Sequence, residues 1–282
     1  MEYNDFIRQG MPLTVFGVND SYKSYLISTT EAPVLFVVND LLSAGIFKDL
    51  INGFCDKKVV IIPPKDELLI QRKAFSKDTS YLRLLGLSEI HTADVVICPI
   101  ETVMQKTCSS FNSINISCQN DFDLNKIISD LVVMGYKKTD GVQGKGTFSV
   151  RGDILDLYPV NYDNPIKIDF FGDTVERIRE YNLDSRKIER NLDSITVIQA
   201  VEKIYSESEI NEIDALIKKA CAIADKESRT NLLLSYENFK IASENKDYDP
   251  MSVYASIVDN AVNISGLIKK DTVVIFDEPK RS

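Results

Sequence analysis

The segment GTFSVRGDILDLYPVNYDNPIKIDFFGDTVERIREYNLD, residues 146–184, alternates apolar and polar side chains over stretches broken by Gly, Asp, Asn and Pro. A period of two residues is typical of strands with one buried face, and these breaks are typical of turns. The segment therefore predicts an antiparallel meander. The amphipathic run LNKIISDLVVMGY, residues 124–136, predicts a helix before it that stops at Gly135. Together they predict a small α+β domain over residues 114–198.

The alternation also assigns side chains to the two faces of the meander. The side chains predicted to point outward are Ser149, Arg151, Lys167, Asp169 and Phe171. An outward cation beside an outward aromatic ring favours partner binding, because arginine and aromatic anchors dominate interface energetics. Periodicity alone leaves a second interpretation open, in which Phe171 covers the end of the core. The RGD tripeptide, residues 151–153, is interpreted as a bend between strands.

Residues 1–113 have a different pattern. Short apolar runs alternate with helical stretches that begin near Asp20 and after Asn39, and the second helix places Leu42, Ile46 and Leu50 on one face. The runs predicted to be strands are LTVFGV (13–18), PVLFVV (33–38), KVVIIPP (58–64) and DVVICPI (94–100). Apolar strands separated by helices are typical of a doubly wound parallel sheet, so an α/β domain is predicted here.

Residues 199–282 are predicted to be mainly helical. One helix opens with a capping box of Ser206 and Glu209, and a second is predicted over PMSVYASIVDNAV, residues 250–262. The final run DTVVIFDEP, residues 271–279, reads as a buried strand. We expect it to return to the first sheet, which would make the middle domain an insertion. A core strand at the end also predicts that the chain is a piece of a longer protein.

The stretch VFGVNDSYKSYL, residues 15–26, resembles a phosphate-binding P-loop, G-x-x-x-x-G-K-[ST], with one part changed. Gly17, Lys23 and Ser24 stand at the required offsets, but Tyr22 replaces the second glycine. That glycine lets the backbone approach the phosphates, whereas Tyr22 would place its Cβ and ring there. The loop is therefore interpreted as a remnant. The alternative is an ATP-dependent, DNA-acting enzyme. In it Lys23 would contact the phosphate, and Asp277 and Glu278 would bind Mg²⁺ and water.

Composition narrows the function classes. The 282 residues carry a net charge of −9, which disfavours a protein that binds mainly DNA phosphates. The basic residues Arg177, Arg179, Arg186 and Lys187 could bind DNA, but the acidic residues between them favour a salt-bridged surface. The single histidine, His91, and five scattered cysteines predict neither a metal site nor disulfides, and a cytoplasmic location. No apolar run is long enough to span a membrane.

The RGDILDLYP…IDFFGD stretch closely resembles the second domain of the UvrB-like module of bacterial transcription-repair coupling factors, and it is similar to UvrB itself. The resemblance extends to the changed P-loop, and to VVIIPPKDELL (59–69), YLRLLGLSEIHTADVVICPIETVMQK (81–106) and VVIFDEP (273–279). UvrB has an intact P-loop and a long DNA-clamping hairpin. Here Tyr22 interrupts the loop, and IQRKAFSKDTS (70–80) leaves no room for that hairpin. Both departures favour the coupling factors.

The resemblance implies a docking module with no catalytic residue of its own, which recruits UvrA to nucleotide excision repair. Family interface positions fall on Arg151, Lys167 and Phe171. Position 167 is often arginine in relatives, and lysine loses the bidentate pairing with a carboxylate, so a weaker or rearranged contact is expected there. Asp277 and Glu278 stand where a Walker B motif would lie. ATP, RNA polymerase and DNA are expected to bind other domains of the parent protein, and the fragment is expected to be monomeric.

Overall fold

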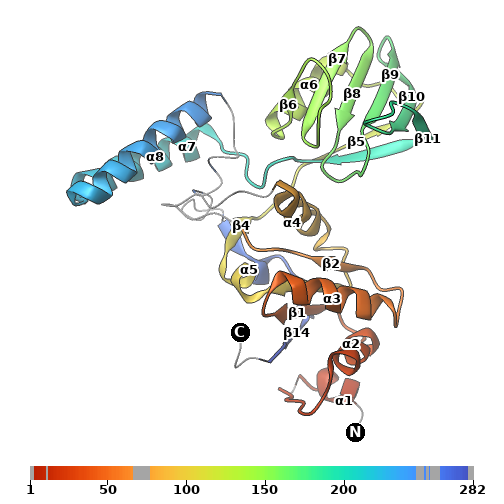
Figure 1. The fold of residues 1–282 in the computed structure, drawn as a ribbon, viewed down its shortest axis with the longest axis vertical. Helices are drawn as coiled ribbons and strands as arrows, with labels where there is room; N and C mark the ends of the chain where they lie inside the picture. Colours follow the sequence, from red (N-terminus) through yellow and green to blue (C-terminus); the bar gives the residue numbers. More distant parts are fainter. Residues whose placement is uncertain are drawn as a thin grey trace. The chain divides into compact units, whose positions relative to one another are not determined.

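The computed structural model describes residues 3–10, 12–65, 77–245, 251, 254 and 261–278 (Figure 1). They fall into two compact units. The first contains the described residues up to 65, 77–109 and 262–278, and the second those within 110–261. The described residues of 199–261 thus fall into the second unit, so the compact units differ from the predicted domains 1–113, 114–198 and 199–282. Those domain boundaries stay a prediction.

The first unit is built on a four-stranded parallel sheet in the order β14-β1-β3-β2. Its strands are β1 (Val34–Val38), β2 (Val59–Ile61), β3 (Val95–Pro99) and β14 (Val273–Phe276). In the middle of the sheet Phe36 pairs with Ile97 on one side and with Ile275 on the other. The late strand β14 therefore completes a sheet begun near the N-terminus. This confirms the predicted α/β domain made from two chain segments.

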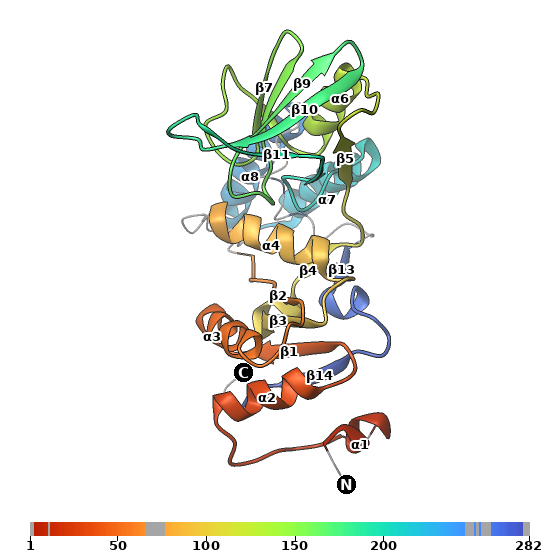
Figure 2. The same ribbon diagram turned by 90° about the vertical axis from the view of Figure 1, so that its right-hand side faces the viewer.

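Helices cover the sheet because its strands are apolar on both faces. The helical elements of this unit are α1 (Tyr3–Arg8), α2 (Asp20–Thr29), α3 (Leu41–Asn52), α4 (Lys77–Glu89), α5 (Ile100–Met104) and the 3₁₀ turn η2 (Ile264–Gly266); β4 (Lys106–Cys108) pairs with β13 (Ala261–Asn263). Helix α3 packs on the sheet through Phe47, whose ring meets that of Phe36 at 4.8 Å. Figure 2 shows α2, α3 and α4 from a second side. A Cβ on Gly86 of α4 would lie 2.4 Å from the Ile61 carbonyl oxygen, so that close approach requires glycine.

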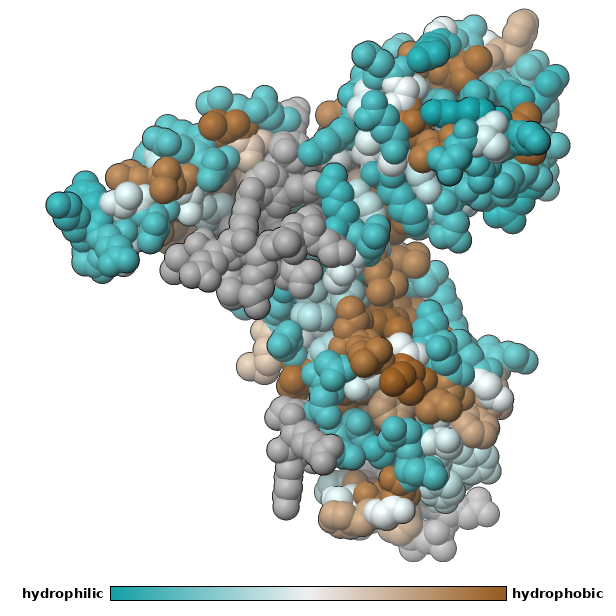
Figure 3. Space-filling view, in the orientation of Figure 1, coloured by the Kyte–Doolittle hydropathy of each residue, from teal (hydrophilic) through white to brown (hydrophobic). Residues whose placement is uncertain are grey.

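Three predictions for this unit are wrong. Residues 13–18 form no strand, and Phe16 is 86% exposed. The sheet is formed by β14, β1, β3 and β2 without this segment, and residues 13–17 are exposed, because an apolar run alone does not supply a partner strand. In α3 the predicted apolar face points outward: Leu42 is 76% exposed, whereas Phe47 is buried. Figure 3 shows apolar surface gathered over this part of the unit. The final strand β14 is an edge strand and half-exposed rather than buried.

The second unit contains a six-stranded sheet in the order β11-β10-β9-β8-β7-β6, antiparallel except for the pair β6–β7. Its strands are β6 (Lys137–Lys138), β7 (Thr147–Arg151), β8 (Ile154–Tyr158), β9 (Ile166–Phe171), β10 (Thr174–Tyr181) and β11 (Ile188–Leu192). Helix α6 (Leu124–Val133) precedes it, and β5 (Ser113–Ser117) pairs with β12 (Ser194–Ile198). The meander predicted from residues 146–184 is confirmed. The RGD tripeptide forms the β7–β8 hairpin, with Gly152 at φ 59°.

One face of this sheet is the core face, as alternation predicts. Its buried side chains are Phe148, Leu155, Leu157, Ile166, Ile168, Phe170, Val175 and Ile178. The opposite face carries the residues predicted to point outward, and one of them, Ser149, is only 4% exposed. A serine reaches less far from the sheet than its cross-strand neighbour Asp156, so pointing outward does not make it accessible.

Helices α7 (Glu207–Ile223) and α8 (Lys226–Glu244) follow the sheets. The predicted capping box is confirmed: the Glu209 N–H bonds Ser206 Oγ, and the Ser206 N–H bonds Glu209 Oε2 at 2.9 Å. Helix α8 was not predicted. Most of the predicted helix at 250–262 lies outside the described residues, as does most of the connection at 70–80. Within the described part of the chain, no helix is long and apolar enough to cross a membrane.

Candidate functional site

Strand register brings the three predicted interface residues onto one side of the β7–β10 sheet. We call this side the outer face and define it by Ser149, Arg151, Ile154, Asp156, Lys167, Asp169, Phe171, Arg177, Arg179 and Tyr181. Arg151 pairs with Ile154, Ile154 with Asp169, and Asp169 with Arg177, so these four form one row across four strands. Lys167 and Phe171 lie two residues to either side of Asp169 on β9. The row therefore passes between them.

Arg151 and Phe171 both lie at hairpin ends. Arg151 precedes the β7–β8 turn and is exposed, and its guanidinium donates to the Asp140 carbonyl at 2.8 Å. Phe171 precedes the β9–β10 turn and is 77% exposed. Because β8 and β9 are antiparallel, the start of β8 and the end of β9 are neighbours, and the two turns lie at the same end of the sheet. This exposure disfavours the interpretation in which Phe171 covers the end of the core.

Lys167 is held by Tyr181, which the sequence analysis did not identify. The Lys167 ammonium lies 5.4 Å from the centre of the Tyr181 ring, a cation–π distance. The Tyr181 hydroxyl donates to Asp156 at 2.6 Å and accepts from the Arg186 guanidinium at 3.1 Å. Burial, followed by the hydrogen bond with Asp156, raises the pKa of Tyr181, so its hydroxyl stays protonated. The ring therefore favours an orientation of Lys167 across the outer face.

Two of the basic residues considered for DNA binding, Arg179 and Arg186, contact other side chains of the second unit. Arg179 forms an ion pair with Asp169, which neutralises the one carboxylate in the central row. Arg186 contacts Tyr181, as described above. Glu180 is buried and accepts from Arg190 at 2.6 Å. These contacts agree with a salt-bridged surface more than with a surface of cations directed at phosphates.

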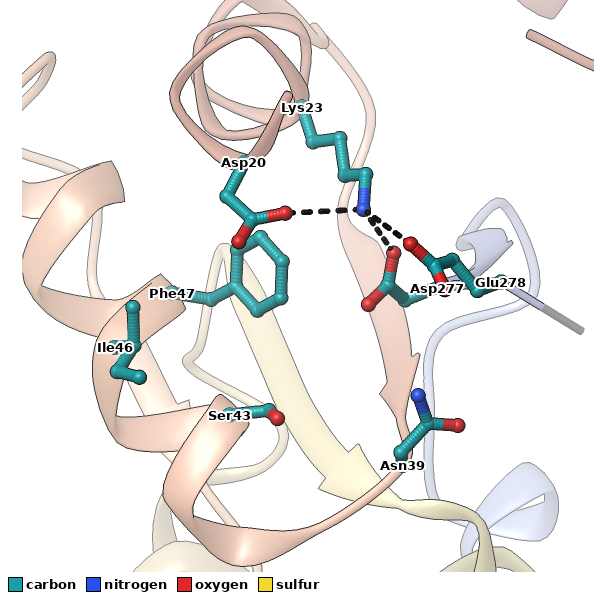
Figure 4. Close-up of a pocket in the computed structure, with 8 residues that line it drawn as sticks. All are labelled: Asp20, Lys23, Asn39, Ser43, Ile46, Phe47, Asp277 and Glu278. Carbon is teal, nitrogen blue, oxygen red and sulfur yellow. Dashed lines mark hydrogen bonds and ion pairs between the residues drawn. The ribbon is translucent and has the colours of Figure 1, made fainter. Parts of the chain in front are cut away.

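The P-loop-like stretch and the end of the chain meet in the first unit. Lys23 Nζ lies 2.7 Å from Asp277 Oδ1, 3.0 Å from Asp20 Oδ1 and 3.7 Å from Glu278 Oε1 (Figure 4). Asp277 follows β14 directly, and its N–H donates to the Val37 carbonyl at 2.8 Å. Burial opposes the charge on Lys23, but its bonds with Asp277 and Asp20 prevail and raise the lysine pKa. Lys23, Asp277 and Glu278 were predicted from the sequence, whereas Asp20 was not.

The other parts of the P-loop pattern are arranged differently from the prediction. Tyr22 is 50% exposed on α2, its ring 6.0 Å from that of Tyr25, so it does not fill the hollow beside Lys23. Ser24 is buried, and its hydroxyl donates to the Asp20 carbonyl at 2.9 Å. Gly17 has φ 72°, which suits glycine. The hollow is lined by Asp20, Lys23, Asn39, Ser43, Ile46, Phe47, Asp277 and Glu278. Three carboxylates, rather than Tyr22, thus occupy the surroundings of Lys23.

The acidic and thiol side chains can be compared with the arrangement that a metal ion requires. Among the residues that the structure describes, no group of three or more His, Cys, Asp or Glu side chains is arranged to hold a metal ion. The carboxylates at the hollow converge on the Lys23 ammonium instead. The described cysteines are free thiols, and burial raises the pKa of Cys98 to about 12, which keeps that thiol protonated and unreactive.

Comparison with known proteins relates this architecture to DNA repair. Residues 114–202 match the UvrB interaction domain, a range that contains the whole outer face. Over 275 residues the chain is 25% identical to the transcription-repair-coupling factor of Bacillus subtilis, covering 92% of this chain and 23% of that protein. It is 23% identical over 290 residues to the coupling factor of Staphylococcus haemolyticus, covering 95% and 24%.

A UvrB is also among the relatives. The UvrABC system protein B of Fervidobacterium nodosum is 26% identical over 238 residues, which cover 73% of this chain and 36% of that protein. The resemblance predicted from the sequence is therefore confirmed. The chain spans about a quarter of the length of the coupling factors that it matches.

Proposed function

We propose that this chain is a non-catalytic docking module of a transcription-repair coupling factor, and that it recruits UvrA through the outer face. In this proposal the parent protein is an ATP-dependent translocase, which acts on RNA polymerase and DNA through other domains. The module then links stalled transcription to nucleotide excision repair. The observation that carries the proposal is the outer face itself, which presents Arg151, Lys167 and Phe171 together within the segment that matches the UvrB interaction domain.

The chemistry of the outer face supports a protein partner with carboxylates. Arg151 and Phe171 are accessible, and they belong to the residue types that most often anchor interfaces. Lys167 is positioned over Tyr181 and loses little conformational freedom on binding. Asp169 is paired with Arg179, so its charge does not repel an acidic partner. The accessible charge of the face is consequently positive around an aromatic side chain.

The hollow beside Lys23 supports the non-catalytic part of the proposal. A nucleotide would bring several negative charges to a lysine that already pairs with three carboxylates. Ser24, whose hydroxyl would hold Mg²⁺ in a P-loop, is turned to the helix backbone. We therefore propose that the first unit binds no ATP. Titration of the chain with Mg-ATP in a calorimeter should give no saturable heat, and a micromolar Kd would refute this part.

The docking proposal is tested by binding of purified UvrA to the unaltered chain and to Arg151→Ala. We expect a saturable complex with the unaltered chain, and a loss of about 2 kcal/mol or more, roughly thirtyfold in Kd, with the variant. Arg229→Ala is the matched control, because it removes the same charge from an exposed position on α8. Equal affinity of the two variants would remove Arg151 from the interface.

A further inference from the structure

The outer face also exposes an apolar residue, Ile154, at its centre. Ile154 is not one of the three expected interface residues. Ile154 is the first residue of β8 and is 39% exposed, whereas its inward neighbour Leu155 is fully buried. Among the described residues of β7–β10, Ile154 and Phe171 are the large apolar side chains with substantial exposure. Ile154 therefore contributes little to the core of the sheet, and its exposed surface is available to a partner.

Register places Ile154 between the expected interface residues. It lies directly opposite Arg151 on β7 and directly opposite Asp169 on β9. Lys167 and Phe171 are the residues two positions to either side of Asp169, so both are diagonal neighbours of Ile154. Diagonal neighbours are about 7–8 Å apart and are within reach of long side chains. Arg151, Lys167 and Phe171 thus surround Ile154.

The charges around Ile154 define what can bind there. Arg151 is adjacent, Lys167 is diagonal, and the Asp169 carboxylate is neutralised by Arg179. A partner that covers this region must present apolar surface at its centre and carboxylates towards the flanking cations. An apolar centre enclosed by polar contacts that exclude water is the arrangement found at interface hot spots.

We infer that Ile154 is the apolar centre of the partner-binding face and receives an apolar side chain that is flanked by carboxylates on UvrA. This inference rests on the proposed function. It adds a fourth contact residue, and it assigns the central contact to apolar burial rather than to charge. Arg151 and Lys167 then orient the partner around that contact.

The test compares Ile154→Val with Ile154→Thr in UvrA binding measured by calorimetry. Valine and threonine have nearly the same shape and both suit a strand, but threonine replaces a methyl group with a hydroxyl. Burying that hydroxyl without a partner weakens binding, so we expect about tenfold weaker binding for Ile154→Thr and less than about threefold for Ile154→Val. Ile223→Thr, at an 83% exposed position at the end of helix α7, is the matched control and should bind normally.

Salt separates this contact from the ionic ones. Added salt should shrink the loss caused by Arg151→Ala, because it screens exposed charges, and it should leave the loss caused by Ile154→Thr unchanged. Thermal unfolding by circular dichroism should show that both Ile154 variants are folded. Wild-type affinity of Ile154→Thr, with weakened Arg151→Ala, would overturn the inference and leave the proposed function standing. Absence of any binding by the unaltered chain would overturn both.

Discussion

The ion pairs of Lys23 predict how firmly the last strand is attached to the first sheet. Lys23 and Asp277 have side chains only 16% and 9% exposed, and their charged atoms are 2.7 Å apart. Lys23→Met keeps most of the aliphatic stem but leaves the Asp277 carboxylate without this ammonium. Breaking a fully buried pair costs about 3–5 kcal/mol. Because Asp20 and Glu278 are about half exposed, we expect about 2–3 kcal/mol here.

Hydrogen exchange measures this cost where it should appear. The Val273 and Asp277 amides donate to the Pro33 and Val37 carbonyls, so their exchange reports the detachment of β14 from β1. A loss of 2–3 kcal/mol corresponds to exchange roughly 30- to 150-fold faster in Lys23→Met. Amides of β9 and β10, in the second unit, should exchange as before and serve as the internal control.

A double variant isolates the charge effect from the loss of packing. Lys23→Met with Asp277→Asn should be less destabilised than Lys23→Met alone, because the buried carboxylate is removed and only the half-exposed Asp20 and Glu278 remain. The pKa of Lys23 is raised above 10.5, so its contribution is complete below pH 10.5 and is lost as the pH rises through the higher folded value. Unchanged exchange of the β14 amides in Lys23→Met would refute the assignment of Lys23 as the residue that secures β14.

Three further predictions concern the second unit. Phe171→Ala should weaken UvrA binding by about 2 kcal/mol, since a ring that is 77% exposed offers on the order of 150 Å² for burial, and should leave the unfolding midpoint unchanged. Lys167→Arg should strengthen UvrA binding several-fold in the same titration, because a guanidinium pairs bidentately with a carboxylate. Burial opposes the charge on Glu209, but hydrogen bonds from Lys203 and Ser206 lower its pKa below 4.5. This contribution to stability is present above pH 4.5 and is lost as the pH falls through the pKa of Glu209 in the folded protein. In Glu209→Gln, the helical signal in circular dichroism should therefore depend less on pH in the acid range.

The sequence predicted those elements whose residues can be buried favourably in only one arrangement. Runs such as VLFVV at 34–38 are apolar on both faces, so they form strands covered by helices. The alternation of β9 fixes Lys167 and Phe171 outward because a shift by one residue would bury a lysine and expose isoleucines. The capping box at Ser206 was predicted because it involves only Ser206 and Glu209, which are three residues apart in the sequence.

The errors lie where more than one placement satisfies the local pattern. LTVFGV at 13–18 is as apolar as a strand, but strand formation also requires a partner strand, and the sheet β14-β1-β3-β2 forms without this segment. Helix α3 has apolar residues around most of its circumference, so periodicity could not decide between the side of Leu42 and the side of Phe47. The contact of Tyr181 with Lys167 depends on the register of the neighbouring strands β9 and β10, which a bulge between Val175 and Arg177 shifts. Ile154 was not among the residues predicted to point outward, and its 39% exposure is known from the structure.

The central claim is that the outer face binds UvrA while the hollow beside Lys23 takes no part. It is tested most directly by calorimetric titration of UvrA with three proteins: the unaltered chain, a variant with Ala at positions 151, 167 and 171, and Lys23→Met. We predict saturable binding by the unaltered chain, the same Kd for Lys23→Met, and binding by the triple variant weakened beyond detection. Wild-type affinity in the triple variant would contradict the account.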